Sequence, residues 1–89
     1  MKQVWKFELK GLEEQAMMMP KGAVIISAKA EFDVPVIYAI VDANEKEMEA
    51  KSVKVFATRQ AIDVNMTSWQ YLDTVLTHYG NVVWHIFYK

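Results

Sequence analysis

The sequence contains no cysteine. Disulfides, thiolate zinc sites and cysteine nucleophiles are therefore excluded. The 89 residues include only three glycines, which are scattered, so there is no glycine-rich loop of the kind that cradles phosphates. The two histidines, His78 and His85, stand in no metal-binding spacing, and no GxSxG motif is present. We therefore expect neither an enzyme nor a bound metal or cofactor.

The chain also lacks an excess of charge of one sign and a long apolar run. Ten Lys and Arg residues face eleven Asp and Glu residues, which gives a net charge of -1. A near-neutral chain lacks the basic surface that DNA- and RNA-binding proteins use. The longest apolar stretch, Val34 to Val41, is far shorter than the roughly 20 residues of a membrane-spanning helix. We expect no nucleic-acid polymer and no membrane as partner, and a location in the cytoplasm.

Apolar and aromatic residues are abundant. The chain is 53% hydrophobic, with three Trp, four Tyr, four Phe and six Met. A single domain of this length buries only about 60–65% of the surface of its unfolded chain, so one small core cannot hide all of these side chains. We expect part of them in a subunit interface or a ligand pocket, and predict a homo-oligomer.

Apolar and polar side chains alternate along most of the chain, which is typical of half-buried β-strands. Residues 36–41 are apolar on both faces and predict a central strand. The pattern predicts one all-β domain over residues 1–89, a small antiparallel sheet of about six or seven strands arranged as a meander, a sandwich or an open barrel. The expected strands span residues 2–9, 16–19, 23–32, 36–41, 48–59, 69–77 and 82–88, with a helical turn at 46–51 as an alternative.

The alternation also predicts which side chains share a face and where the chain turns. Val24 and Ile26 are expected on the apolar face of their strand, and Tyr71 on the same face as Val75. Asp33 to Pro35 is expected to be a hairpin connection, and residues 78–81 a tight turn in which Gly80 or Asn81 takes a positive φ.

Arg59 is the only arginine of the chain, and it follows Thr58 where a strand gives way to the polar segment 60–68. Its planar guanidinium is suited to gripping a phosphate or a carboxylate. An arginine at such a position can equally be a solvated surface residue, and that alternative stays open.

Aromatic residues follow the same segment. Trp69 and Tyr71 provide rings on which nucleotide bases stack, although such rings also fill the cores of small β-proteins. His85, near the end of the chain, is either a half-buried core-edge residue or a donor to a ligand phosphate. The candidate ligand-binding residues are therefore Arg59, Thr58, Trp69, Tyr71 and His85, with no catalytic or metal-binding residue among them.

Five segments follow one another along the chain: Val4–Leu9, Met19–Ile25, Tyr38–Asp42, Tyr71–Val75 and Val82–Phe87. In this order and spacing they resemble a family of small proteins of tailed phages and prophages. Those proteins begin with an IWKFEL-like strand, carry MPKGA and WALVD-like segments, and end in VWHVF. The chain departs from that pattern at Thr58-Arg59-Gln60 and at Asp73-Thr74.

The resemblance implies a phage protein made in the host cytoplasm. Small, oligomeric, β-rich phage proteins include sponges that sequester the signal of cyclic-oligonucleotide-based antiphage systems (CBASS). We therefore expect a counter-defence protein that binds a cyclic dinucleotide without cleaving it. The alternative is a protein-interaction module that blocks a host protein or joins an assembly through a sheet edge or an aromatic patch.

Overall fold

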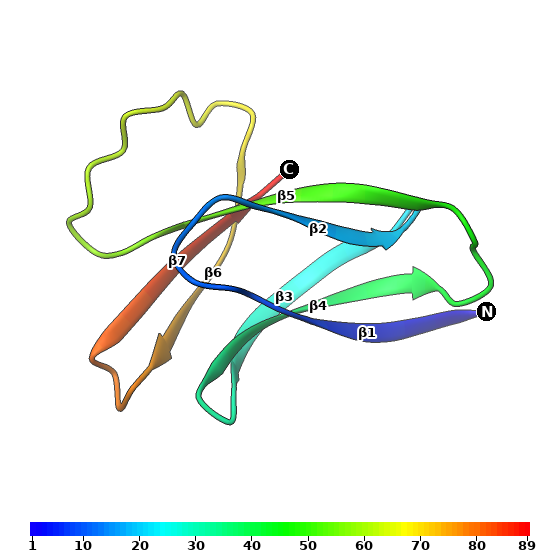
Figure 1. Ribbon diagram of the computed structural model, residues 1–89, viewed down its shortest axis with the longest axis horizontal. Helices are drawn as coiled ribbons and strands as arrows, with labels where there is room; N and C mark the ends of the chain where they lie inside the picture. Colours follow the sequence, from blue (N-terminus) through cyan, green and yellow to red (C-terminus); the bar gives the residue numbers. More distant parts are fainter.

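The computed structural model describes residues 1–89 and contains seven antiparallel strands in two sheets (Figure 1). Three strands form one sheet in the order β1-β4-β3, here called sheet A, and four form the other in the order β2-β5-β7-β6, here called sheet B. No helix is present that has the length and apolar character needed to span a membrane. The strands are β1 (Lys2–Glu8), β2 (Gln15–Pro20), β3 (Val24–Glu31), β4 (Val34–Asp42), β5 (Met48–Phe56), β6 (Gln70–Thr77) and β7 (Val82–Tyr88).

The all-β prediction is confirmed, and the arrangement is a two-sheet sandwich. As predicted, β4 is a central strand, since it pairs with β1 on one side and β3 on the other. The helical alternative at 46–51 is wrong, because this segment contains the start of β5. Strand β5 also ends at Phe56, three residues before the predicted end at Arg59.

The core lies between the two sheets. Each strand turns one row of side chains inward, and Ile37, Val53 and Ile86 are fully buried there. The indole nitrogen of Trp84 donates to the hydroxyl oxygen of Thr77 at 2.8 Å, so the one buried polar side chain is satisfied. The core comprises Leu9, Met17, Met19, Ala23, Ile25, Ala28, Ile37, Ala39, Val41, Val53, Val55, Val75, Trp84 and Ile86.

Two β-bulges overturn part of the predicted side-chain arrangement. In β3 the register shifts between Ile25 and Ser27, so Ile25 is buried, whereas Val24 and Ile26 are 56% and 46% exposed. In β6 the shift falls between Tyr71 and Asp73, which separates Tyr71 from the inward row that contains Val75. One extra residue in a strand reverses the face of every side chain on one side of it.

The outer face of sheet A carries a polar bridge across its three strands. The Lys6 ammonium on β1 and the Tyr38 hydroxyl on β4 both donate to the carboxylate of Glu31 on β3. These hydrogen bonds hold the pKa of Glu31 below its ordinary value of 4.5, and the bond from Lys6 contributes most to this shift. The same bonds raise the pKa of Lys6 and of Tyr38.

This bridge predicts acid sensitivity. A carboxyl whose pKa is lowered by folding stabilises the fold above its unfolded pKa, and that contribution is lost as the pH falls through the lower, folded value. We therefore expect the free energy of unfolding to decrease as the pH falls below about 4.5. Glu31→Gln should be less stable above that pH and should lose less stability on acidification. Urea unfolding at a series of pH values measures both effects, with Glu13→Gln, which removes a carboxylate outside any ion pair, as the control.

Candidate functional site

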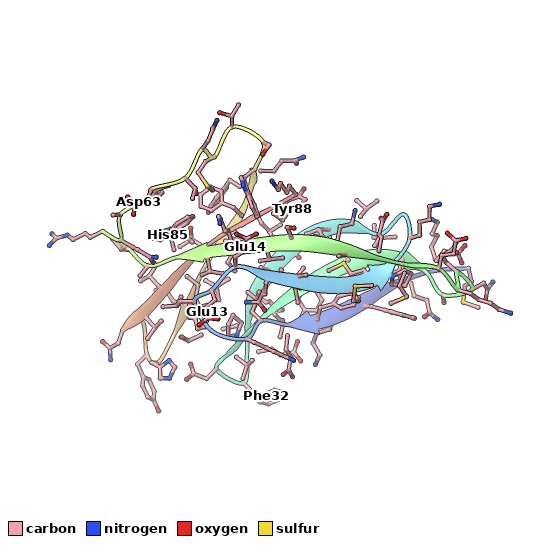
Figure 2. All side chains as sticks on the ribbon, turned by 45° about the horizontal axis from the view of Figure 1, so that its top comes forward. Glu13, Glu14, Phe32, Asp63, His85 and Tyr88 are labelled. Carbon is pink, nitrogen blue, oxygen red and sulfur yellow. The ribbon has the colours of Figure 1, made fainter.

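Three of the five predicted site residues meet on the outer face of sheet B. Strand pairing places His85 of β7 beside Phe56 of β5 and Thr74 of β6. Alternate side chains of a strand point to opposite faces, so the side chains of His85, Phe56 and Thr74 all point away from the core. The segment 57–69, which joins β5 to β6, begins next to them, and Asp63 of this segment lies on the same side of the molecule as His85 (Figure 2).

Hydrogen bonds join these side chains in a network. The hydroxyl oxygen of Thr58 lies 2.7 Å from Nε2 of His85, and that of Thr74 lies 3.3 Å from Nδ1. The Tyr71 hydroxyl lies 2.7 Å from that of Thr74. A neutral imidazole has one donor and one acceptor nitrogen, and both are used here. This hydrogen-bonded network therefore anchors the start of the segment 57–69 to the sheet.

A hydroxyl hydrogen-bonded to an imidazole resembles an activated nucleophile, but the third group differs. In catalytic triads a carboxylate binds the second imidazole nitrogen and stabilises the imidazolium. Here that nitrogen faces the Thr74 hydroxyl, and the nearby carboxylate of Asp73 accepts from the backbone nitrogen of Thr74 instead. Thr58 and His85 therefore lack the carboxylate contact that completes a catalytic triad.

The aromatic rings beside this hydrogen-bonded network pack on one another. Phe87 contacts Phe56 and Tyr71 edge-to-face, with ring centroids 6.0 Å and 5.6 Å apart. Phe56 is buried, whereas Tyr71 remains 57% exposed. Of these rings, Tyr71 offers the most surface to a ligand.

Trp69 takes no part in these hydrogen bonds, and two lysines lie close to its ring. Nζ of Lys89 is 4.7 Å and Nζ of Lys54 is 5.2 Å from the centre of its ring system. Lys54 donates to Glu14 and thereby lowers the pKa of that carboxyl. Lys89 forms no ion pair, although its charge also contributes to the lowered pKa of Glu14.

A pocket of about 250 Å³ lies between the start of β3 and the end of β7. The Tyr88 hydroxyl donates to the amide oxygen of Gln70 at 3.0 Å, which leaves the Gln70 amide nitrogen available to a ligand. Trp69 does not line the pocket; it precedes the lining residue Gln70 in sequence, and its ring lies close to Nζ of the lining residue Lys89. The lining residues are Ala23, Val24, Ile25, Lys51, Gln70, Tyr88 and Lys89.

Arg59 is not part of this pocket. It takes a left-handed φ of 72° in the turn where the backbone nitrogen of Gln60 donates to the carbonyl oxygen of Ala57. Its side chain is exposed and forms no ion pair. The structure thus brings Thr58, Tyr71 and His85 together, places Trp69 beside Lys54 and Lys89, and leaves Arg59 on the loop.

Lys51 and Lys89 were not among the predicted site residues, although the position of Lys51 in its strand is informative. Lys51 lies two and four residues before the buried Val53 and Val55 on the same strand, so its side chain points to the inner face of sheet B. A charged residue on a core-facing row marks either a paired charge or a site. No group of three or more metal-ligating side chains comes together anywhere in the chain.

Two hairpin turns carry aromatic rings in strained conformations. Phe32, between β3 and β4, has a φ of 50° and is 96% exposed, and it projects away from the sheets (Figure 2). Tyr79, between β6 and β7, has a φ of 58° and is also fully exposed. The turns are tied together, because the backbone nitrogen of His78 donates to the Asp33 carboxylate at 2.7 Å. The sequence predicted both connections, but it placed the first at Asp33 to Pro35, whereas β4 already begins at Val34. It predicted neither ring as a functional residue.

Comparison with known families gives one match. A family model described as a domain of unknown function (DUF7352) matches residues 1–89. The chain belongs to this family. No curated protein and no solved structure matches it significantly.

The strained turns of this DUF7352 chain predict that a smaller residue stabilises the fold. A two-residue hairpin turn with positive φ at both positions favours Asn or Gly, and a bulky residue there costs about 1 kcal/mol. Phe32 has almost no packing to lose. We expect Phe32→Asn to raise the free energy of unfolding by about 0.5–1 kcal/mol, as measured by urea denaturation. The exposed Ile62→Asn in the loop serves as the control, and an equal gain there would refute the strain argument.

Proposed function

We propose that this protein binds and holds a cyclic dinucleotide without cleaving it, and that it serves a phage as a counter-defence protein in the host cytoplasm. The observation that carries the proposal is the indole of Trp69 with two ammonium groups close to its ring, one of them from Lys89, which also lines the pocket. A planar ring with cations beside it suits a ligand that combines flat bases with phosphates.

Each part of the pocket has a counterpart in such a ligand. A base stacks on Trp69 in place of an ammonium group, and the displaced lysine turns toward a phosphate. Lys51 and Lys89 supply positive charge, and the free amide nitrogen of Gln70 donates to a base or a ribose. Val24 and Ile25 form an apolar wall. The resemblance to phage proteins supports the biological setting.

The size of the pocket favours a shared ligand. About 250 Å³ lies below the roughly 300–1,000 Å³ of pockets that enclose a drug-sized molecule. One chain therefore encloses only part of a cyclic dinucleotide. A two-fold ligand is best matched by two copies of the pocket, which supports the predicted homo-oligomer.

A calorimetric titration with cyclic dinucleotides tests the proposal. We expect saturable binding and recovery of intact ligand. Trp69→Leu should weaken binding by about 1–3 kcal/mol through lost stacking, and Lys89→Gln by about 1.5–3 kcal/mol through a lost charge-assisted contact. The control Lys10→Gln removes the same charge from an exposed lysine outside the pocket and should leave the affinity unchanged. Absence of binding by the unaltered protein contradicts the proposal, and ligand cleavage indicates an enzyme.

The same titration decides the role of Arg59. The sequence predicts a phosphate contact, for which Arg59→Ala costs about 1.5–3 kcal/mol of binding energy with little loss of stability. That result would mean that the segment 57–69 reaches over the bound ligand. Unaltered affinity removes Arg59 from the site and leaves the cationic role to the lysines.

The strained turns favour a second candidate function, that of a protein-interaction module. Exposed aromatic anchors dominate the energetics of many protein interfaces. On this alternative, no nucleotide binds and a host protein copurifies with the chain. Its capture should be lost when Phe32→Asn and Tyr79→Asn are combined, whereas the nucleotide-binding candidate predicts that these changes leave the titration unaltered.

A further inference from the structure

The outer face of sheet A carries an apolar row that the core does not need. Strand pairing aligns Val4 of β1, Ile40 of β4 and Val24 of β3 in one row across the sheet. Their side chains are 58%, 36% and 56% exposed, and Ile26 beside them is 46% exposed. We infer that a second copy of this chain covers this face, related to the first by a two-fold axis that runs parallel to β4.

The face is a better interface than the edge of the same sheet. Edge strand β1 carries Lys2 and Lys6, and lysines on an edge strand discourage pairing with another strand. On the face, by contrast, Lys6 is already held by Glu31 in the polar bridge. The apolar row beside that bridge has no partner within the chain.

A row at the other end of the face holds two charges without ion pairs. Val36 pairs with Glu8 on one side and with Lys29 on the other, so these two flank the centre of the sheet. Neither Glu8 nor Lys29 forms an ion pair within the chain, although Nζ of Lys29 lies 5.8 Å from the centre of the Tyr38 ring. Their opposite signs on opposite sides make the face complementary to itself under the correct symmetry.

The charges favour an axis parallel to β4 over an axis perpendicular to it. With an axis parallel to β4, β1 of one copy lies over β3 of the other. Residues of one cross-strand row then face residues of the same row in the partner. Glu8 then faces Lys29 of the partner subunit twice, and Val4 faces Val24 of the partner subunit twice. An axis across the strands through the apolar row would instead place Lys2 against Lys6 of the partner subunit, which is unfavourable because the charges are alike.

The size of the face sets the expected strength. Three strands about 4.8 Å apart and about 30 Å long offer roughly 400 Å² on each side, or about 800 Å² in total, which is less than the roughly 1,000 Å² that a stable interface buries. A weak, reversible dimer is therefore expected. Because Val24 also lines the pocket, the second copy closes the pocket on that side.

A charge-exchange experiment tests this dimer without any ligand. Sedimentation equilibrium of the unaltered protein should show a dimer of the 10.3 kDa chain at micromolar to millimolar concentration. Glu8→Lys alone and Lys29→Glu alone should each weaken dimerisation about tenfold or more, since both symmetric contacts become repulsive. An equimolar mixture of the two variants should dimerise again, because every contact then joins opposite charges.

Apolar substitutions give a second, independent measurement. Ile40→Lys should abolish the dimer, whereas Ile62→Lys, which alters an exposed isoleucine on the loop, should leave it intact. A monomer at all concentrations, a dimer insensitive to Glu8→Lys, or a mixture that stays monomeric would each overturn the inference. Nucleotide binding by a monomeric protein would overturn this dimer while leaving the proposed function standing.

Discussion

The fold depends on closing two small sheets around one core, and two β-bulges determine which side chains that core takes. Strand β3 lies against β6 of the other sheet, and each of these strands carries one bulge. Before the bulge in β3 the chain presents Ile25 inward and Val24 outward, whereas beyond it Ala28 points inward. Both proposed binding surfaces follow from this constraint, since Val24 belongs to the pocket rim and to the apolar row of sheet A.

The sequence predicted the strands well, because alternation is a local property. The central position of β4 followed from its apolar side chains on both faces, and the turn at His78 to Asn81 followed from its residue types. The side-chain faces of β3 and β6 were not predictable in the same way. A bulge adds one residue without changing composition, and its position is set by packing against the other sheet. Val24, Ile26 and Tyr71 were therefore assigned to the wrong faces.

The candidate site was predictable only in part, for a related reason. Thr58 and His85 are 27 residues apart in the chain and meet because β5 and β7 are neighbours, an order that alternation does not reveal. Trp69 was predicted as a stacking ring, but its lysine neighbours come from two other segments. Arg59 was chosen because it is the only arginine, and rarity carries no information about where a side chain points. Its role as a ligand contact stays a prediction.

Local charge rather than net charge governs what the protein can bind. Positive and negative residues nearly balance, so the chain as a whole attracts anions only weakly. At physiological ionic strength, however, charges act over only about 8 Å, and within that range the pocket is determined by Lys51 and Lys89. Lys51 forms an ion pair with Glu49 at 3.3 Å, whereas Lys89 forms none, although its charge helps to lower the pKa of Glu14. Under the proposed function, a protein of nearly zero net charge with such local cations would hold a compact anion at one point, whereas binding along a polyanion needs an extended basic surface.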